Sequence, residues 1–75
     1  MAHLGSRLAQ LRKQKGMTQN QLANAIGRDS MTVSRWERGE RIMRADDVAA
    51  VAEALGIHAG LLFEEPTEPT GDEAA

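Results

Sequence analysis

TQNQLANAIGRDSMTVSRWERG, residues 18–39, is the stretch that decides the fold of this chain. It divides at Gly27 into two segments whose apolar residues recur at helical spacing. Thr18 is a favourable N-cap residue for the first segment, and Gln21, three residues later, completes a capping box. The pattern therefore predicts two short helices joined by a tight turn.

The second helix of this pair has two different faces. Asp29 or Ser30 caps it, Gly39 ends it, and Val33 and Trp36 fall on the inner side. A helix that enters the major groove of DNA needs an outer face without bulk, because large side chains would hold it away from the bases. The predicted outer face is small and polar, and consists of Ser30, Met31, Thr32, Ser34 and Arg35.

Helical periodicity continues on both sides of this pair. Leucines recur at helical spacing over residues 4–11, and Gly16 closes that helix. Apolar residues over 48–55 mark a fourth helix closed by Gly56, and a short fifth helix is expected from residue 58 to about residue 63. The chain has 75 residues, only one Trp and one Phe, and few β-branched residues. These features predict a single compact all-α domain of five helices, near the lower size limit for a self-sufficient core.

Residues 64–75, EEPTEPTGDEAA, differ in composition from the rest of the chain. They contain two prolines, five acidic residues and no large apolar residue. This composition predicts a disordered acidic tail after a folded domain that comprises residues 1–63. Two roles are open for the tail: it increases solubility, or it competes with a nucleic acid for a basic face.

The net charge of −2 conceals two halves of opposite sign. Residues 1–44 hold all nine basic residues and three acidic ones, a net charge of +6, whereas residues 45–75 hold eight acidic residues and no base. Such asymmetry suggests that a nucleic acid binds the basic half. The alternative is that the basic side chains only solvate the surface.

Several classes of protein are disfavoured. The sequence has no cysteine, which excludes disulfides and thiolate metal sites. No run approaches the roughly 18 apolar residues of a membrane span, and the first residues do not resemble a secretory signal, so we expect a cytoplasmic protein without a membrane partner. His3 and His58 are the only histidines, and neither has a serine or carboxylate placed for a triad or a spacing typical of a metal site. We therefore expect neither an enzyme nor a cofactor.

Four segments in this order, LRKQKGMTQNQLA, IG, SRWERG and AEALGI, resemble a known family. The sequence is similar to the five-helix DNA-binding domains of phage repressors of the Cro/C1 type and of the bacterial regulators called the XRE family. The resemblance covers residues 4 to about 63. It implies a helix-turn-helix protein that regulates transcription, most often as a repressor, by binding a specific double-stranded DNA operator.

The resemblance also assigns roles to residues. In such domains the third helix lies in the major groove and the second crosses the backbone. Arg35 would bind guanine O6 and N7, and Met31 would lie on a thymine methyl group. The alternatives are a phosphate or surface role for Arg35 and a core role for Met31. The positions implied for base contacts are Ser30, Met31, Arg35 and, more weakly, Ser34.

Backbone contacts are implied for a second set of residues. Gln19 would donate a hydrogen bond to a phosphate and brace the base-reading helix, close to free N–H groups at the start of the second helix. Arg12 and Glu37 match a partly buried ion pair of relatives, although both could equally be solvated charges. The implied phosphate contacts are Thr18, Gln19, Thr32, Arg38, Arg41 and Arg44, with Arg41 preferred over the other two arginines.

The sequence departs from the family pattern at three places. Relatives commonly carry small residues where Arg28 and Asp29 lie, and Asp29 is a cap rather than a DNA contact. Relatives often have Gln at Ser30, so direct readout is weaker there. Relatives usually have Pro-Ser where this chain has Met43 and Arg44, so the fourth helix loses a good N-cap.

Assembly and exact role stay open at this stage. A homodimer on a pseudo-palindromic operator is expected, with half-sites about 10–10.5 bp apart. Leu62 and Phe63 are the candidates for a dimer interface, with Leu61 expected in the core, although closure of the core could use all three. The alternatives to a repressor are a DNA-binding antitoxin, a restriction-modification controller, and a protein-interaction module that kept the fold without binding DNA.

Overall fold

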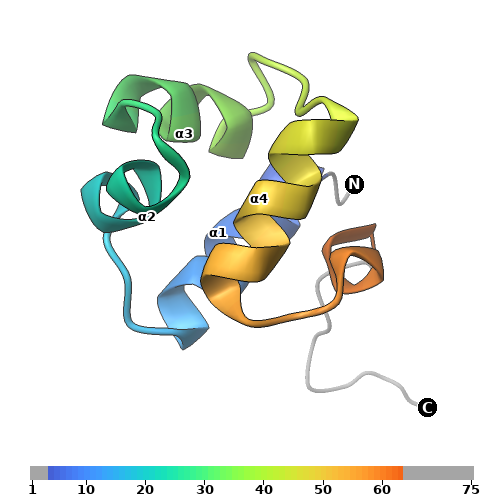
Figure 1. Cartoon of the computed structure of the whole chain (residues 1–75). Helices are drawn as coiled ribbons and strands as arrows, with labels where there is room; N and C mark the ends of the chain where they lie inside the picture. Colours follow the sequence, from blue (N-terminus) through green and yellow to red (C-terminus); the bar gives the residue numbers. More distant parts are fainter. Residues whose placement is uncertain (1–3, 64–75) are drawn as a thin grey trace, which may run out of the picture.

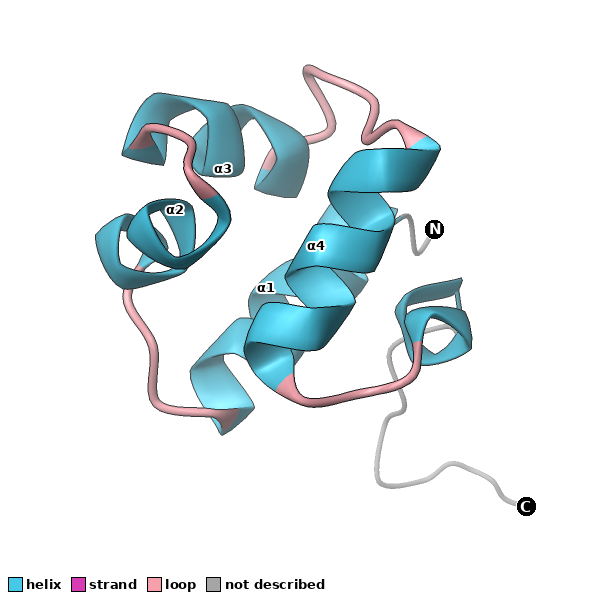
Figure 2. Cartoon of the chain, viewed as in Figure 1, coloured by secondary structure: helices cyan, strands magenta, loops and turns pink. Residues whose placement is uncertain are grey.

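The computed structural model describes residues 4–63, so the predicted disordered tail, residues 64–75, and His3 lie outside the described residues. Within the described part the fold is all-helical, without strands (Figure 2). The elements are α1 (Leu4–Gln14), α2 (Gln19–Ile26), α3 (Ser30–Glu37), α4 (Ala45–Leu55) and the 3₁₀ helix η1 (Ala59–Phe63) (Figure 1). The prediction of an all-α class is confirmed.

The prediction of five helices is wrong, because the described residues contain four α-helices. The fifth segment, η1, is a 3₁₀ helix of five residues, AGLLF. So short a segment, with Gly60 in it, gains little from α-helical hydrogen bonds, and 3₁₀ geometry is the usual form of such short pieces. The segment still packs on the rest of the protein, through Leu62, which is fully buried.

The core is built from every element of the described fold. α2 packs against α3, α1 packs against α3, and η1 contacts both α1 and α4 (Figure 1). Trp36 is the largest fully buried side chain and the aromatic residue of the core, since Phe63 is exposed. The largest fully buried side chains are Trp36, Leu8, Leu22, Leu62, Val33 and Val51.

Local signals set the ends of α2 as predicted. The Thr18 Oγ1 atom accepts a hydrogen bond from the Gln21 N–H at 3.0 Å, and the Gln21 Oε1 atom accepts one from the Thr18 N–H at 2.9 Å. This is a complete capping box. Gly27 ends the helix with φ of 74°, a left-handed conformation that favours glycine.

The start of α4 shows how the chain compensates for the missing Pro-Ser. Arg44 occupies the N-cap position, and its N–H donates to the Asp47 Oδ2 atom at 3.1 Å. Asp47 therefore supplies the reciprocal half of a capping box, and its negative charge suits the N-terminal end of the helix dipole. The expected loss of a side-chain cap from the N-cap residue itself is confirmed, because the Arg44 side chain makes no such bond.

Gly5 lets α1 approach the C-terminal end of α3 closely. A Cβ atom at this position would lie 2.1 Å from the Trp36 carbonyl oxygen and 2.7 Å from the Glu37 carbonyl oxygen. Both distances are far inside van der Waals contact, so no other residue fits here without movement of a helix. At the other side of α1, the Arg7 Nε atom donates to the Leu61 carbonyl oxygen at 3.0 Å and ties η1 to α1.

The exposure of the last residues of η1 corrects one expectation and supports another. Leu62, and not Leu61, is the residue that enters the core; Leu61 is only partly buried. Leu62 is therefore not available for a dimer interface in this arrangement. Phe63 is 66% exposed, as expected for a surface candidate. A window of six residues with 3₁₀ geometry has too few turns for helical periodicity to tell the two leucines apart.

Candidate nucleic-acid interface

α3 turns one face to the core and the other to solvent. Val33 is fully buried and Trp36 is 1% exposed, as helical periodicity predicts. Ser30, Met31 and Arg35 are exposed on the outer face. Met31 is 52% exposed, so the alternative that it fills a gap in the core is wrong. Within residues 4–63 no hydrogen bond is made by these three outer side chains, which therefore take little part in holding the fold.

Asp29 caps α3 and accepts hydrogen bonds from both the backbone N–H and the hydroxyl group of Thr32. The Asp29 Oδ1 atom accepts hydrogen bonds from the Thr32 N–H at 2.9 Å and from the Thr32 Oγ1 atom at 2.8 Å. Both bonds lower the pKa of Asp29 below its usual value, and the bond from the backbone N–H has the larger effect. The nearby charges of Arg35 and Arg41 lower this pKa further. The expectation that Asp29 is a cap is confirmed.

The assignment of Thr32 as a phosphate contact conflicts with this cap. Thr32 is only 9% exposed, and both its backbone N–H and its hydroxyl hydrogen are directed to Asp29. A phosphate oxygen accepts hydrogen bonds and would need one of those hydrogens. The spacing of Asp29 and Thr32 is that of an N-cap and the third helical residue. This spacing was the signal in the sequence that Thr32 bonds to Asp29 and not to DNA.

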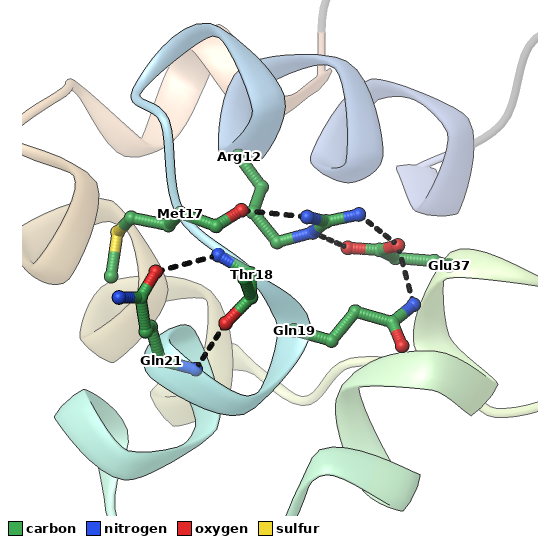
Figure 3. A network of polar contacts seen from close by, with 6 residues as sticks. All are labelled: Arg12, Met17, Thr18, Gln19, Gln21 and Glu37. Atoms are coloured by element: carbon green, nitrogen blue, oxygen red, sulfur yellow. Dashed lines mark hydrogen bonds and ion pairs between the residues drawn. The ribbon is translucent and has the colours of Figure 1, made fainter.

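A buried ion pair fixes the C-terminal end of α3 against α1 (Figure 3). The Arg12 Nε and Nη2 atoms donate to the Glu37 carboxylate at 2.6 and 3.1 Å, a two-point contact. The side chains of Arg12 and Glu37 are only 10% and 7% exposed. The Arg12 Nη1 atom also donates to the Met17 carbonyl oxygen at 2.7 Å, in the loop before α2. The predicted pair is therefore confirmed, and the alternative of two solvated charges is wrong.

Gln19 joins the same network from the start of α2. Its Nε2 atom donates to the Glu37 Oε1 atom at 2.9 Å (Figure 3), so Gln19 contacts α3 as the resemblance implied. One Nε2 hydrogen of Gln19 remains for another acceptor. Thr18 is exposed, and its hydroxyl oxygen is used by the cap. The N–H groups of Gln19 and Asn20, in the first turn of α2, have no acceptor within the helix, which makes this end suitable for an anion.

Ser34 and Arg38 are linked to each other. The Arg38 Nη1 atom donates to the Ser34 Oγ atom at 2.5 Å, one helical turn back on α3. The Nε and Nη2 atoms of the same guanidinium donate to the two Glu40 oxygens at 3.0 and 3.2 Å. The hydrogen bond between Arg38 and Glu40 raises the pKa of Arg38 and lowers that of Glu40, and the charge of each adds to the shift. Arg38 is therefore exposed but paired with Glu40. Arg41 and Arg44 are also exposed, in the loop before α4.

Sequence reasoning missed a second ion pair that holds the turn between α2 and α3. The Arg28 Nη2 atom donates to the Asp47 Oδ1 atom of α4, and the Arg28 guanidinium carbon lies 5.8 Å from the centre of the Trp36 ring. Asp47 is thus shared by Arg28 and the Arg44 N–H. The unusual charge in the turn was a signal, but its partner lies 19 residues away in sequence and carried no motif.

Other kinds of site find no support in the part of the chain that is described. No group of three or more His, Cys, Asp and Glu side chains in residues 4–63 could hold a metal ion. No helix in the same residues is long and apolar enough to cross a lipid bilayer. The distinctive feature of this surface is the pair α2–α3, with an exposed outer face on α3 and exposed arginines beyond it.

Comparison with known proteins agrees with this geometry. A family model described as a helix-turn-helix domain matches residues 3–63. Among curated proteins, the uncharacterized HTH-type transcriptional regulator y4aM of Sinorhizobium fredii is 29% identical over 68 residues, which cover 91% of this chain and 48% of that protein. The chain spans about half the length of the curated relatives it matches.

Solved structures share the fold. The restriction-modification controller protein C.AhdI of Aeromonas hydrophila is 38% identical with a TM-score of 0.78, over 80% of this chain and 87% of that one. The P22 c2 repressor, crystallised in complex with a synthetic operator, is 25% identical with a TM-score of 0.78, over 85% of this chain and 97% of the repressor chain.

A similar domain also occurs within an enzyme. The match to the hydroxypropylphosphonic acid epoxidase of S. wedmorenis has 29% identity and a TM-score of 0.75, over 81% of this chain. It covers only 32% of the epoxidase chain. The likeness to this enzyme is therefore partial.

Proposed function

This chain belongs to the helix-turn-helix domain family, and from that premise we propose that it regulates transcription by binding a specific sequence of double-stranded DNA with α3 in the major groove. The observation that carries the proposal is the division of α3. Its inner residues Val33 and Trp36 are buried in the core. On its outer face Ser30, Met31 and Arg35 are exposed, and their side chains make no hydrogen bond within the described residues. Similar proteins that are named as a controller protein or as a transcriptional regulator support the same role.

Base readout is assigned to the outer face of α3. Arg35 binds guanine O6 and N7 with its planar guanidinium, a contact worth about 1–3 kcal/mol of discrimination against the wrong base. Met31 lies on a thymine methyl group, to which its large exposed fraction, 52%, is suited. Ser30 is short and exposed, so it contributes a weaker contact next to the cap of α3.

Phosphate contacts are assigned to both sides of that helix. The start of α2, with Thr18, Gln19 and free backbone N–H groups, binds the phosphates of one strand. Arg41 and Arg44, exposed in the loop between α3 and α4, bind those of the other strand. Gln19 has two tasks in this arrangement, because it bonds Glu37 while its second amide hydrogen reaches the DNA.

Two copies of the chain bind together on a pseudo-palindromic operator. One domain offers a small number of base contacts, and a second copy about one helical turn away, 10–10.5 bp, doubles them. Phe63 at the end of η1 is the exposed apolar residue that we assign to the contact between the two copies.

Control of a restriction-modification system is the second candidate. It is favoured by the 38% identity to the controller protein C.AhdI, which is matched over 87% of its chain. The physical mechanism is the same as for a repressor, and only the regulated genes differ. An antitoxin would also share the mechanism, and a protein-interaction module would lack affinity for DNA.

Selection of bound sequences from a random DNA pool, followed by anisotropy measurements, tests the proposal. We expect a preferred motif with two half-sites, and an affinity that falls steeply between about 50 and about 200 mM salt as phosphate contacts release counterions. Arg35→Ala and Gln19→Ala are expected to weaken binding to that motif, whereas Lys13→Ala, which removes an exposed charge on α1, is a control for net charge. A folded protein without affinity for duplex DNA at low salt would reject the proposal in favour of a protein-interaction module.

A further inference from the structure

Arg38 follows α3 directly, and its side chain joins two residues that lie on either side of it. Ser34 is one turn earlier on α3, and its Oγ atom accepts from the Arg38 Nη1 atom at 2.5 Å. Glu40 is in the loop that follows, and its two oxygens accept from Nε and Nη2 at 3.0 and 3.2 Å. The three side chains form a chain of hydrogen bonds that runs from the loop to the outer part of α3.

Glu40 makes Arg38 a poor ligand for phosphate. Its carboxylate takes two of the five N–H donors of the guanidinium in a two-point contact and cancels the charge of Arg38 locally. A phosphate that approached Arg38 would have to displace this carboxylate or lie beside another negative charge. Both side chains are about half exposed, 52% and 55%, so the pair lies at the surface and not in the core.

The same contact determines what Ser34 can offer to a base. A serine hydroxyl has one hydrogen to donate and two lone pairs that accept. Arg38 donates to one of these lone pairs, so the Ser34 hydrogen points elsewhere. In the major groove, acceptors are guanine N7 and O6, adenine N7 and thymine O4, whereas cytosine N4 is a donor. Ser34 held in this way favours a base that presents an acceptor over cytosine.

We propose that Arg38 is a positioning residue, held by Glu40, that makes Ser34 a hydrogen-bond donor to a base edge, and that it is not a phosphate ligand. The proposal rests on the proposed function, because it requires α3 to lie in the major groove. It replaces the assignment of Arg38 as a phosphate contact and gives Glu40 a role in specificity.

The test compares variants on two duplexes, the preferred motif from the selection and a shuffled sequence of the same length. Arg38→Ala, Ser34→Ala and the double variant form a cycle, and thermal unfolding checks that each is folded. We expect each single variant to reduce the ratio of the two affinities by about 5-fold or more, which corresponds to the lower part of the range for one base contact. The double variant should lose no more than either single one, because both remove the same interaction.

Salt dependence separates a positioning role from a phosphate contact. Arg38→Ala should leave the slope of log affinity against log salt unchanged, whereas loss of a phosphate ligand would reduce it by about 0.9. Arg38→Lys keeps the charge but not the planar fork, so it should behave as Arg38→Ala on the preferred motif. Equal weakening on both duplexes with a reduced slope, or additive losses in the cycle, would overturn the proposal.

Glu40→Gln tests whether the Glu40 carboxylate keeps Arg38 away from the phosphates. Release of Arg38 to the phosphates should steepen the salt slope by about 0.9, so that affinity for the shuffled duplex falls about 3.5-fold more between about 50 and about 200 mM salt than in the unaltered protein. Glu53→Gln removes an equal exposed charge from α4 and should change nothing. An unchanged slope in Glu40→Gln would contradict the proposal while the proposed function stood, whereas an unaltered protein that bound no duplex would reject both.

Discussion

Glu37 is the residue at which α1, α2 and α3 meet. Its carboxylate accepts two hydrogen bonds from Arg12 and one from Gln19, and its side chain is 7% exposed. A buried pair of this kind adds little net stability compared with a pair of apolar residues, but the removal of one partner leaves a charge uncompensated. The orientation of α3 therefore depends on both partners being present.

Arg12→Met should lower the free energy of unfolding by about 3 kcal/mol, because it leaves the Glu37 carboxylate buried without its cation. Denaturant titration followed by circular dichroism measures the change. The double variant Arg12→Met/Glu37→Met is the control, and it should recover more than half of the loss. A single variant as stable as the unaltered protein would mean that water solvates Glu37.

Asp29 links the stability of α3 to pH. Its pKa in the folded protein lies below the usual value of 3.8, so its contribution is complete above pH 3.8 and is lost as the pH falls through the folded pKa. Asp29→Asn keeps a good N-cap but cannot titrate. The difference in Tm between the unaltered protein and Asp29→Asn should therefore shrink as the pH falls from about pH 4 to about pH 2. A difference that stayed constant over this interval would show that the charge of Asp29 does not matter.

The distance between two packed helices in this fold depends on the size of the side chain at single positions. Gly5 is a clear case, since the backbone of α1 lies against the last carbonyl groups of α3 and no Cβ fits between them. This contact places α1 so that Arg12, two turns later, reaches Glu37. The approach of the two helices and the buried ion pair are therefore parts of one arrangement.

Gly5→Ala should destabilise the protein by about 1–3 kcal/mol, because its Cβ would lie 2.1 Å from the Trp36 carbonyl oxygen. Thermal unfolding measures the effect. Gly60→Ala is the matched control, since nothing lies within 4 Å of its Cβ position, and its effect should stay within about 0.5 kcal/mol. Equal Tm values for the two variants would show that α1 can move away from α3 without cost.

The elements that carry local signals could be predicted from the sequence. The caps Thr18 and Asp29, and the glycine at residue 27, act on neighbouring residues, so α2 and α3 follow from the residues within them. η1 has no cap and no full α-helical turn, and its geometry depends on what it packs against. The burial of Leu62 could not be predicted from local signals either, because it is set by tertiary contacts.

The site was predicted less completely than the fold. The Arg12–Glu37 pair came from the resemblance, since nothing local indicates a contact across 25 residues. The same lack of a local signal hid the pair between Arg28 and Asp47. Thr32 was assigned to phosphate by its place near the start of a helix, whereas the cap turns it inward. Tertiary pairing therefore decides which polar residues of α3 are free.

The molecule as a whole separates its charges along the sequence. Within the described residues, 4–44 carry a net charge of +6, whereas 45–63 hold three acidic residues and no base. α2 and α3 belong to the basic part, and η1 follows the acidic helix α4. In the proposed function, a duplex would therefore be attracted to the part that holds the proposed readout helix, and the proposed contact between two copies through η1 would lie in the other part.

Phe63→Ser should weaken the association of two copies but leave the fold intact, because the side chain is 66% exposed. Sedimentation and binding to duplexes with one or two half-sites measure the effect, which should be confined to the two-site duplex. Leu62→Ser is the contrasting variant and should lower Tm instead, since Leu62 is fully buried. Unchanged cooperativity in Phe63→Ser would exclude this residue from the contact.

One face of α3 packs in the core and the other is exposed, and this division affects how the DNA specificity of such a protein can change in evolution. The side chains of Ser30, Met31 and Arg35 make no hydrogen bond within residues 4–63, while the buried side of the same helix is held by the core. Mutations on the outer face are therefore close to neutral for folding, and a duplicated gene could acquire a new operator in a few steps without passing through an unfolded ancestor.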